Sequence, residues 1–310
     1  TTRPPQQNNT QPRQTQQNVT QQTVQVVPPT QNVQPSAKDF YEKGKKALAE
    51  GKINEATELF KKALEMTPNY VEALYELGQI QLQLRDFSSA ITTLQRATDI
   101  ATKSYMAHLK LGEAYQGNQE YYRAIATYKK AIEINPKLTE AYMNIGNVYM
   151  ELYQFKQSVE WFNKAILINK NLADTYIRIG AANMYMGDYD EAETNFKKAL
   201  YVDPRSLEAL LKISDLYIVK KKYADALKSL KEAEKINPND EKVYYGLGKL
   251  YSSQNNLRDA IAAYNNALRI NRNNPDTHNN LGNTYFLMND FQKSIQYYSN
   301  TIKLNPNYLQ

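Results

Sequence analysis

The sequence predicts an all-α array of paired helices. Glycine recurs at the same phase of a strict 34-residue period, with one serine filling the single gap, at Gly44, Gly78, Gly112, Gly146, Gly180, Ser214, Gly248 and Gly282. Two small residues follow each of these positions, 12 and 19 residues later, with a large apolar residue between them. A chain of 310 residues exceeds the size of most single cores, and a fixed period of this length is typical of a stacked repeat protein.

Each period is predicted to hold two helices, the first centred on the glycine. The second carries the small–large–small series, whose i, i+4, i+7 spacing marks one helical face, as in Ala56, Phe60 and Ala63. The turn between the helices contains Gly51, Gly187 or polar pairs such as Asn-Asp. Proline ends the second helix in five units, at Pro68, Pro136, Pro204, Pro238 and Pro306. The remaining three units carry Thr102, Lys170 and Arg272 there.

The chain divides at residue 36. Of the first 36 residues, 28 are Gln, Thr, Pro or Asn, a composition that buries too little apolar area to fold. Residues 1–36 are therefore expected to form a disordered linker. Residues 37–308 are divided into eight units, 37–70, 71–104, 105–138, 139–172, 173–206, 207–240, 241–274 and 275–308.

Composition excludes several classes of function. There is no cysteine, and the net charge of +6 is spread along the chain, so neither a thiolate site nor a nucleic-acid surface is indicated. No apolar stretch is long enough to span a membrane. The two histidines, His108 and His278, lie five units apart at equivalent positions, which argues against a metal site. The sequence indicates no catalytic residues, cofactor or metal. The missing cysteines and polar linker favour a bacterial periplasmic location, with the cytoplasm as the alternative.

The repeated residues resemble the tetratricopeptide repeat family. The period, the helix-A glycine with a preceding Leu or Ile, the two small helix-B positions and the terminal proline all coincide over residues 37–308. The resemblance implies a right-handed superhelical solenoid of antiparallel helix pairs. It also implies a concave groove, lined by the first helices, that binds peptide segments or helices of partner proteins. The carboxylate clamp of members that bind chaperone C-termini is not matched.

The resemblance places groove positions three before, one after and four after each glycine. The central units carry apolar residues there, so the groove is expected to accept an apolar partner segment, at Leu109, Met143, Met150, Ile177, Met184, Leu211 and Ile218. Asparagines nearby are expected to hydrogen-bond the partner's backbone, at Asn144, Asn147, Asn279, Asn280 and Asn283. Packing of neighbouring turns and a general asparagine bias are the alternatives.

The predicted function is a non-enzymatic scaffold or adaptor that binds a protein segment in this groove. The alternative is a structural subunit fixed in a larger assembly through its ends and convex face. The basic run Lys220-Lys221-Lys222 is diluted by acidic neighbours, which favours a solvated turn over an anion-binding surface.

The two end units differ. The first carries Lys43 and Ala47 where inner units place apolar residues, so its outer face is polar. The last keeps the inner pattern and is expected to offer a contact face for self-association or for another subunit, formed by Leu281, Tyr285, Phe286, Tyr297, Tyr298 and Ile302.

Overall fold

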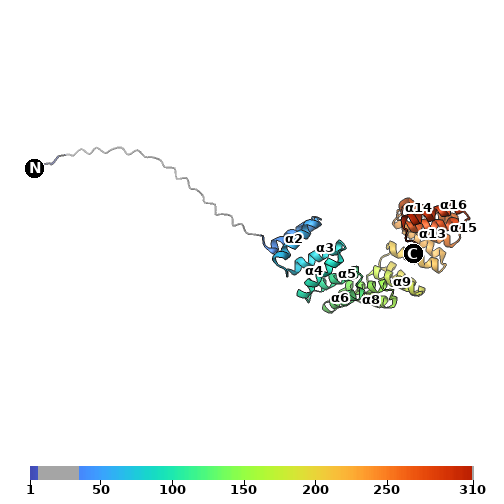
Figure 1. The fold of residues 1–310 in the computed structure, drawn as a ribbon, viewed down its shortest axis with the longest axis horizontal. Helices are drawn as coiled ribbons and strands as arrows, with labels where there is room; N and C mark the ends of the chain where they lie inside the picture. The colour runs from blue at the N-terminus through green and yellow to red at the C-terminus, as the bar shows by residue number, and fades with distance from the viewer. Residues whose placement is uncertain (6–34, 309–310) are drawn as a thin grey trace.

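The computed structural model describes residues 1–5 and 35–308, and every regular element in these ranges is an α-helix. The helices follow one another along a curved stack (Figure 1). They are α1 (Ala37–Ala49), α2 (Ile53–Met66), α3 (Val71–Gln83), α4 (Phe87–Ile100), α5 (Tyr105–Gly117), α6 (Tyr121–Ile134), α7 (Thr139–Glu151), α8 (Phe155–Ile168), α9 (Ala173–Met186), α10 (Tyr189–Val202), α11 (Leu207–Val219), α12 (Tyr223–Ile236), α13 (Glu241–Ser253), α14 (Leu257–Ile270), α15 (Pro275–Leu287) and α16 (Phe291–Leu304).

The predicted fold class is confirmed, since adjacent helices pack in pairs and each 34-residue unit holds one odd-numbered and one even-numbered helix. The segment expected to be a linker falls almost entirely on residues outside the described ranges.

A glycine on the odd helix faces a large side chain on the even helix of the same unit. A Cβ atom on Gly146 would lie 2.5 Å from Cε1 of Phe162, whose side chain is fully buried. The same close approach joins Gly44 to Phe60, Gly78 to Leu94, Gly112 to Tyr128, Gly180 to Phe196, Gly248 to Tyr264 and Gly282 to Tyr298. The glycine grid therefore reflects helix contact within each pair, which any side chain would widen.

The small residues of the even helices let the next unit approach. Ala97 of α4 is fully buried in one cluster with Leu74 of α3 and Ala107 of α5, so it contacts both its own unit and the following one. The earlier small position contacts the odd helix of its own unit: in the fourth unit it is Ser158, whose hydroxyl donates to the carbonyl of Gly146 at 2.8 Å. Each even helix thus lies between two odd helices, and burial is shared along the stack.

The turn within each pair requires one residue in the left-handed region. Gly51 and Gly187 supply it with φ of 74° and 81°. The other six units place a non-glycine residue there, namely Arg85, Gln119, Tyr153, Lys221, Asn255 and Asn289. A bulky residue rarely adopts this conformation, so Tyr153, with φ of 56°, stands out among them.

The two ends of the array differ in polarity. Helix α1 begins with a capping box, in which Ser36 and Asp39 hydrogen-bond reciprocally, and its outer side exposes Lys43 and Lys46. The backbone and hydroxyl of Ser36 lower the pKa of Asp39. Helix α16, in contrast, leaves Ile295 66% and Ile302 49% exposed. The polar first unit and apolar last unit expected from the sequence are both present.

Candidate partner-binding groove

The odd-numbered helices line the inner side of the curved stack. Successive odd helices contact one another directly across the intervening even helix, as α3 with α5, α5 with α7, α9 with α11, α11 with α13, and α13 with α15. Elements on the inside of a curved stack lie closest together, so this surface is concave. Two cavities open on it, one of about 620 Å³ beside α5 and α7, and one of about 610 Å³ beside α11 and α13. We call the first, lined by residues such as Glu113, Glu140 and Glu151, the repeat-four cavity. We call the second, lined by residues such as Leu211, Lys212 and Tyr245, the repeat-seven cavity.

Two of the seven apolar residues expected to line the groove belong to the hydrophobic core. Leu109 and Ile177 are each only 4% exposed and pack into two of the hydrophobic clusters, so neither is available to a partner. The superhelix buries them because neighbouring odd helices are in contact. The other five members are half-buried, at Met143, Met150, Met184, Leu211 and Ile218. The groove is consequently less apolar than the sequence suggested.

Most of the expected groove asparagines already have partners within the chain. Asn280 donates to the hydroxyl of Tyr245 at 3.0 Å, and Asn283 accepts from the hydroxyl of Tyr298 at 2.6 Å. Asn147 accepts from Arg178 at 3.2 Å. Asn279 is half-buried, while Asn144 lines the repeat-four cavity. Of the five, Asn144 is therefore the best placed to hydrogen-bond a segment lying in the groove.

The repeat-four cavity is lined by carboxylates. Glu113 accepts from Nζ of Lys110 through both oxygens at 2.9 Å, and burial nevertheless raises the pKa of Glu113. Glu151 accepts from the side-chain amide of Gln116 at 2.7 Å. Glu140 lines the same cavity, and neither it nor Glu151 forms an ion pair within the described residues.

An aromatic cluster, which we call the aromatic platform, borders this cavity. It consists of Tyr121, Tyr153, Phe155 and Tyr185, and with Met150 and Glu151 it encloses a further cavity of about 370 Å³. The rings of Phe155 and Tyr185 are stacked, with centroids 5.0 Å apart, and Tyr153 meets Phe155 edge-on at 6.2 Å. Tyr153 is 80% and Tyr185 71% exposed.

Sequence reasoning missed the platform. Its signal was present at Tyr153, which occupies a turn position that carries glycine or a polar residue in every other unit.

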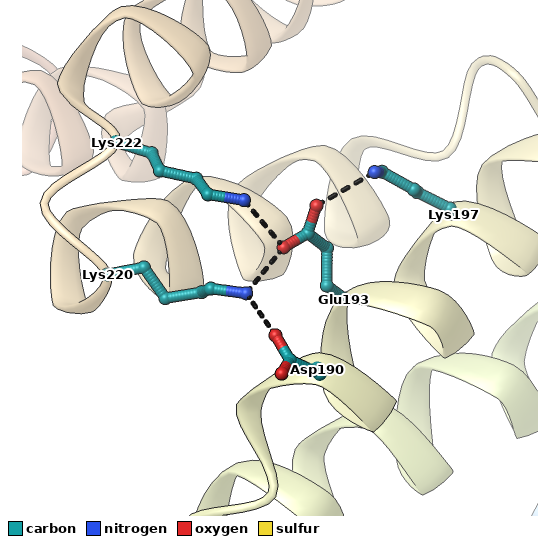
Figure 2. A network of polar contacts seen from close by, with 5 residues as sticks. All are labelled: Asp190, Glu193, Lys197, Lys220 and Lys222. Atoms are coloured by element: carbon teal, nitrogen blue, oxygen red, sulfur yellow. Dashed lines mark hydrogen bonds and ion pairs between the residues drawn. The ribbon is translucent and has the colours of Figure 1, made fainter.

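Two lysines of the basic run at the α11–α12 turn, Lys220 and Lys222, form ion pairs with carboxylates of α10 (Figure 2). Lys220 lies 2.6 Å from Asp190 and 2.7 Å from Glu193, and Lys222 lies 3.1 Å from Glu193. Lys197 is 2.8 Å from the other oxygen of Glu193. Hydrogen bonds from Lys197 and Lys220 lower the pKa of Glu193 to about 2. The cluster joins the fifth and sixth units, so Lys220 and Lys222 lie in ion pairs between units, where the sequence predicted a solvated turn.

We expect Glu193→Gln to lower the free energy of unfolding at pH 7 by about 2 kcal/mol. The folded-state pKa of Glu193 is depressed from 4.5 to about 2, so its stabilisation is complete above pH 4.5 and disappears as the pH falls through 2. Urea unfolding at several pH values should show the gap between variant and parent closing over that window. Glu191→Gln, on the exposed side of the same helix, is the control. A gap that persists unchanged at pH 2 would contradict this account.

The expected C-terminal contact face is only partly exposed. Leu281 is fully buried against Ala260 and Tyr264, so it is not available at the surface, and Tyr298, which packs on Gly282, is half-buried. Tyr285 and Tyr297 stack on each other with centroids 5.4 Å apart and are half-buried. Of the six, only Phe286 and Ile302 are exposed, at 54% and 49%. The structure adds Ile295 and Phe291 to this surface, at 66% and 52%.

Among the described residues, no three metal-binding side chains come together, and no helix is long and apolar enough to cross a membrane.

Comparison with protein families identifies the repeat. A family model described as "Cilia and flagella-associated protein 70 C-terminal domain" matches residues 15–280. A second model, described as "Tetratricopeptide repeat", matches residues 275–308, which is one 34-residue unit of the array. The chain belongs to the tetratricopeptide repeat family. Tetratricopeptide repeats are typical protein-interaction modules and are generally non-enzymatic. A search among curated proteins gave no match.

Solved structures share the tetratricopeptide repeat fold. A tetratricopeptide repeat protein from Parabacteroides merdae is 22% identical, with a TM-score of 0.64 over 80% of this chain and 98% of that one. MamA is 30% identical, with a TM-score of 0.52 over 55% of this chain and 92% of MamA. The APC/C hetero-tetramer Cut9-Hcn1 is 14% identical, with a TM-score of 0.60 over 90% of this chain and 55% of the matched chain. The first and last of these similarities show the fold alone.

Proposed function

We propose that this tetratricopeptide repeat array is a non-enzymatic scaffold that binds a segment of a partner protein in its concave groove. The observation that carries the proposal is that the cavities on the concave side are lined by side chains that repeat packing does not use. Around the repeat-four cavity this holds for Glu140, and around the repeat-seven cavity it holds for Lys212.

The geometry suits an extended segment. Both cavities lie along the odd helices, and each provides hydrogen-bonding groups beside partly apolar walls, as at Leu211 and Tyr245. Backbone groups of an extended segment need partners when they leave water, and amide and carboxylate side chains supply them. Because the groove residues are carried on packed helices, little ordering is needed on binding, which favours affinity.

A crosslinking experiment tests this proposal. A photoreactive amino acid placed at Asn144 or Lys212 should join the chain to a discrete partner from its native extract, since both residues line concave cavities. The same residue at Asn163, exposed on the even helix α8, should give no such product. The crosslinked peptide of the partner, read by mass spectrometry, should be the same segment for repeated preparations. A specific product at Asn163 and none at the two concave sites would reject groove binding.

We also propose that the C-terminal end contacts a second protein surface, by preference another copy of this end. Ile295 and Ile302 of α16 occupy positions at which most inner units carry a buried or half-buried apolar side chain, such as Ile125, which is 6% exposed, and Leu268. A head-to-tail contact is disfavoured because α1 offers the charged side chains of Lys43 and Lys46. Burial of a helix-sized apolar patch contributes several kcal/mol at about 25 cal/mol per Å².

The double variant Ile295→Lys/Ile302→Lys should remove concentration-dependent association in sedimentation velocity, weakening it by at least about tenfold. Leu167→Lys, at a residue that is 79% exposed on α8, is the matched control and should associate like the parent. A parent protein that stays monomeric at every concentration would eliminate self-association through this face.

A further inference from the structure

We propose that the groove beside repeats three to five recognises a partner segment that carries arginine, with the guanidinium stacked on the aromatic platform and paired with Glu151 and Glu140. This inference rests on the proposed function, because it assigns the chemistry of the segment that the scaffold holds. Two separate features lead to it: a surplus of carboxylates in the repeat-four cavity, and the exposed rings beside them.

The carboxylates of this cavity lack sufficient cationic partners within the chain. Three line it, Glu113, Glu140 and Glu151, against two cations, Lys110 and Arg85. The ammonium of Lys110 is already bonded to both oxygens of Glu113. The guanidinium of Arg85 lies over the ring of Phe87 in its own unit, with 5.8 Å between Cζ and the ring centroid.

The cavity therefore carries a surplus of one negative charge, and neither Glu140 nor Glu151 forms an ion pair within the described residues. The surplus is local, because the whole chain carries a net charge of +6. A segment with positive charge would therefore be attracted to this groove and not to the chain in general.

One residue of the aromatic platform, Tyr153, has an unfavourable backbone conformation. Tyr153 adopts φ of 56°, a region that disfavours a bulky side chain, and yet its ring is 80% exposed and gains little burial in return. The stacked pair of Phe155 and Tyr185 extends the exposed ring surface next to Glu151. One strained, exposed tyrosine beside a partly exposed ring pair at the edge of a groove favours a ligand that uses the ring faces.

Arginine fits both features better than the alternatives. Its planar guanidinium stacks on an aromatic face and presents paired N–H donors to a carboxylate, whereas the lysine ammonium is a compact charge without a stacking plane. A purely apolar segment would cover the platform but would also desolvate Glu151 without pairing it, which is unfavourable. Recognition by ring and carboxylate together therefore selects arginine over lysine and over apolar side chains.

The test uses the full chain and labelled 12-residue peptides of one polar, proline-containing sequence with three arginines, three lysines or three citrullines. Fluorescence anisotropy should show the arginine peptide binding about tenfold tighter than the lysine peptide, and the citrulline peptide should not bind detectably. The double variant Glu140→Gln/Glu151→Gln should weaken arginine-peptide binding by about tenfold. Glu160→Gln/Glu191→Gln removes the same charge from exposed even-helix positions and should leave binding unchanged.

Tyr153→Gly separates binding from folding. Glycine relieves the positive φ, so the variant should unfold at or above the parent's temperature, while losing about threefold to fivefold in affinity for the arginine peptide. Equal affinity for the arginine and lysine peptides, or wild-type affinity in both the Tyr153 and the glutamate variants, would overturn the assignment. Crosslinking through Asn144 to a native segment without arginine would overturn it too, while leaving groove binding intact.

Discussion

Gly146→Val is expected to destabilise the protein by about 3 kcal/mol, because the groove of α7 that receives Phe162 has no room for a side chain. A Cβ atom at this position would lie 2.5 Å from Cε1 and 2.6 Å from Cδ1 of the ring, which is fully buried and cannot swing away. Valine adds two further carbon atoms to that contact. Urea unfolding followed by circular dichroism measures the loss, and the fourth unit should open first.

Ser214→Ala is the matched control for this substitution. Ser214 occupies the same position in the sixth unit and already places a Cβ atom there, opposite Leu230. The variant loses the 2.7 Å hydrogen bond from its hydroxyl to the carbonyl of Leu211, so a change of about 1 kcal/mol or less is expected. A Gly146→Val protein as stable as the parent would mean that the helices of a pair do not interlock as described.

Phe196→Ala is expected to cost about 4 kcal/mol, the upper part of the range for removing a buried aromatic side chain. Phe196 is fully buried and belongs to a cluster that includes residues of α11, α12 and α13, such as Leu216 and Leu230. Stability in a stacked array depends on neighbouring units, so the loss should be local. Hydrogen exchange should show amides of α9 to α12 losing protection, while those of α1 to α4 keep it.

Leu167→Ala provides the comparison, because Leu167 is 79% exposed and its truncation should change stability by less than about 0.5 kcal/mol. Uniform loss of protection from α1 to α16 in Phe196→Ala would contradict the local coupling and would instead indicate one cooperative unit.

The fold could be predicted from the sequence because each unit repeats the same contact. A glycine opposite a large side chain and a small residue beside the next helix leave few arrangements open. Seven of the eight units carry this glycine, and the sixth carries Ser214 in its place. Turn conformation was less accessible. Two units have a glycine at the left-handed position, Gly51 and Gly187, and glycine predicts that conformation. The other six units have other residue types there, such as Arg85 and Tyr153. There, packing of the two helices sets the backbone.

The position of the groove could be predicted from the sequence, but the side chains that are accessible in it could not. Leu109, Ile177 and Leu281 were expected to be accessible because the period does not show how closely neighbouring units approach. Contacts between odd helices bury Leu109 and Ile177, and Ala260 and Tyr264 of the preceding even helix bury Leu281. Asn280 donates a hydrogen bond to Tyr245, which is 35 residues away in the chain. This bond depends on how the side chains of two adjacent units meet.

The aromatic platform has the same origin. The rings of Phe155 and Tyr185 belong to successive units, and they come into contact only because the helices of these units pack together.

We propose that the array binds its partner on its concave side, with the repeat-four cavity and the aromatic platform as one of the contacts. Hydrogen exchange of the full chain, with and without the segment identified by crosslinking at Asn144, tests it most directly. Amides in the second halves of α5 and α7, and at the turn that carries Tyr153 and leads into α8, should gain protection, while the second halves of α6, α8 and α10 should be unchanged. Protection confined to the even helices, or to α16 alone, would contradict the claim.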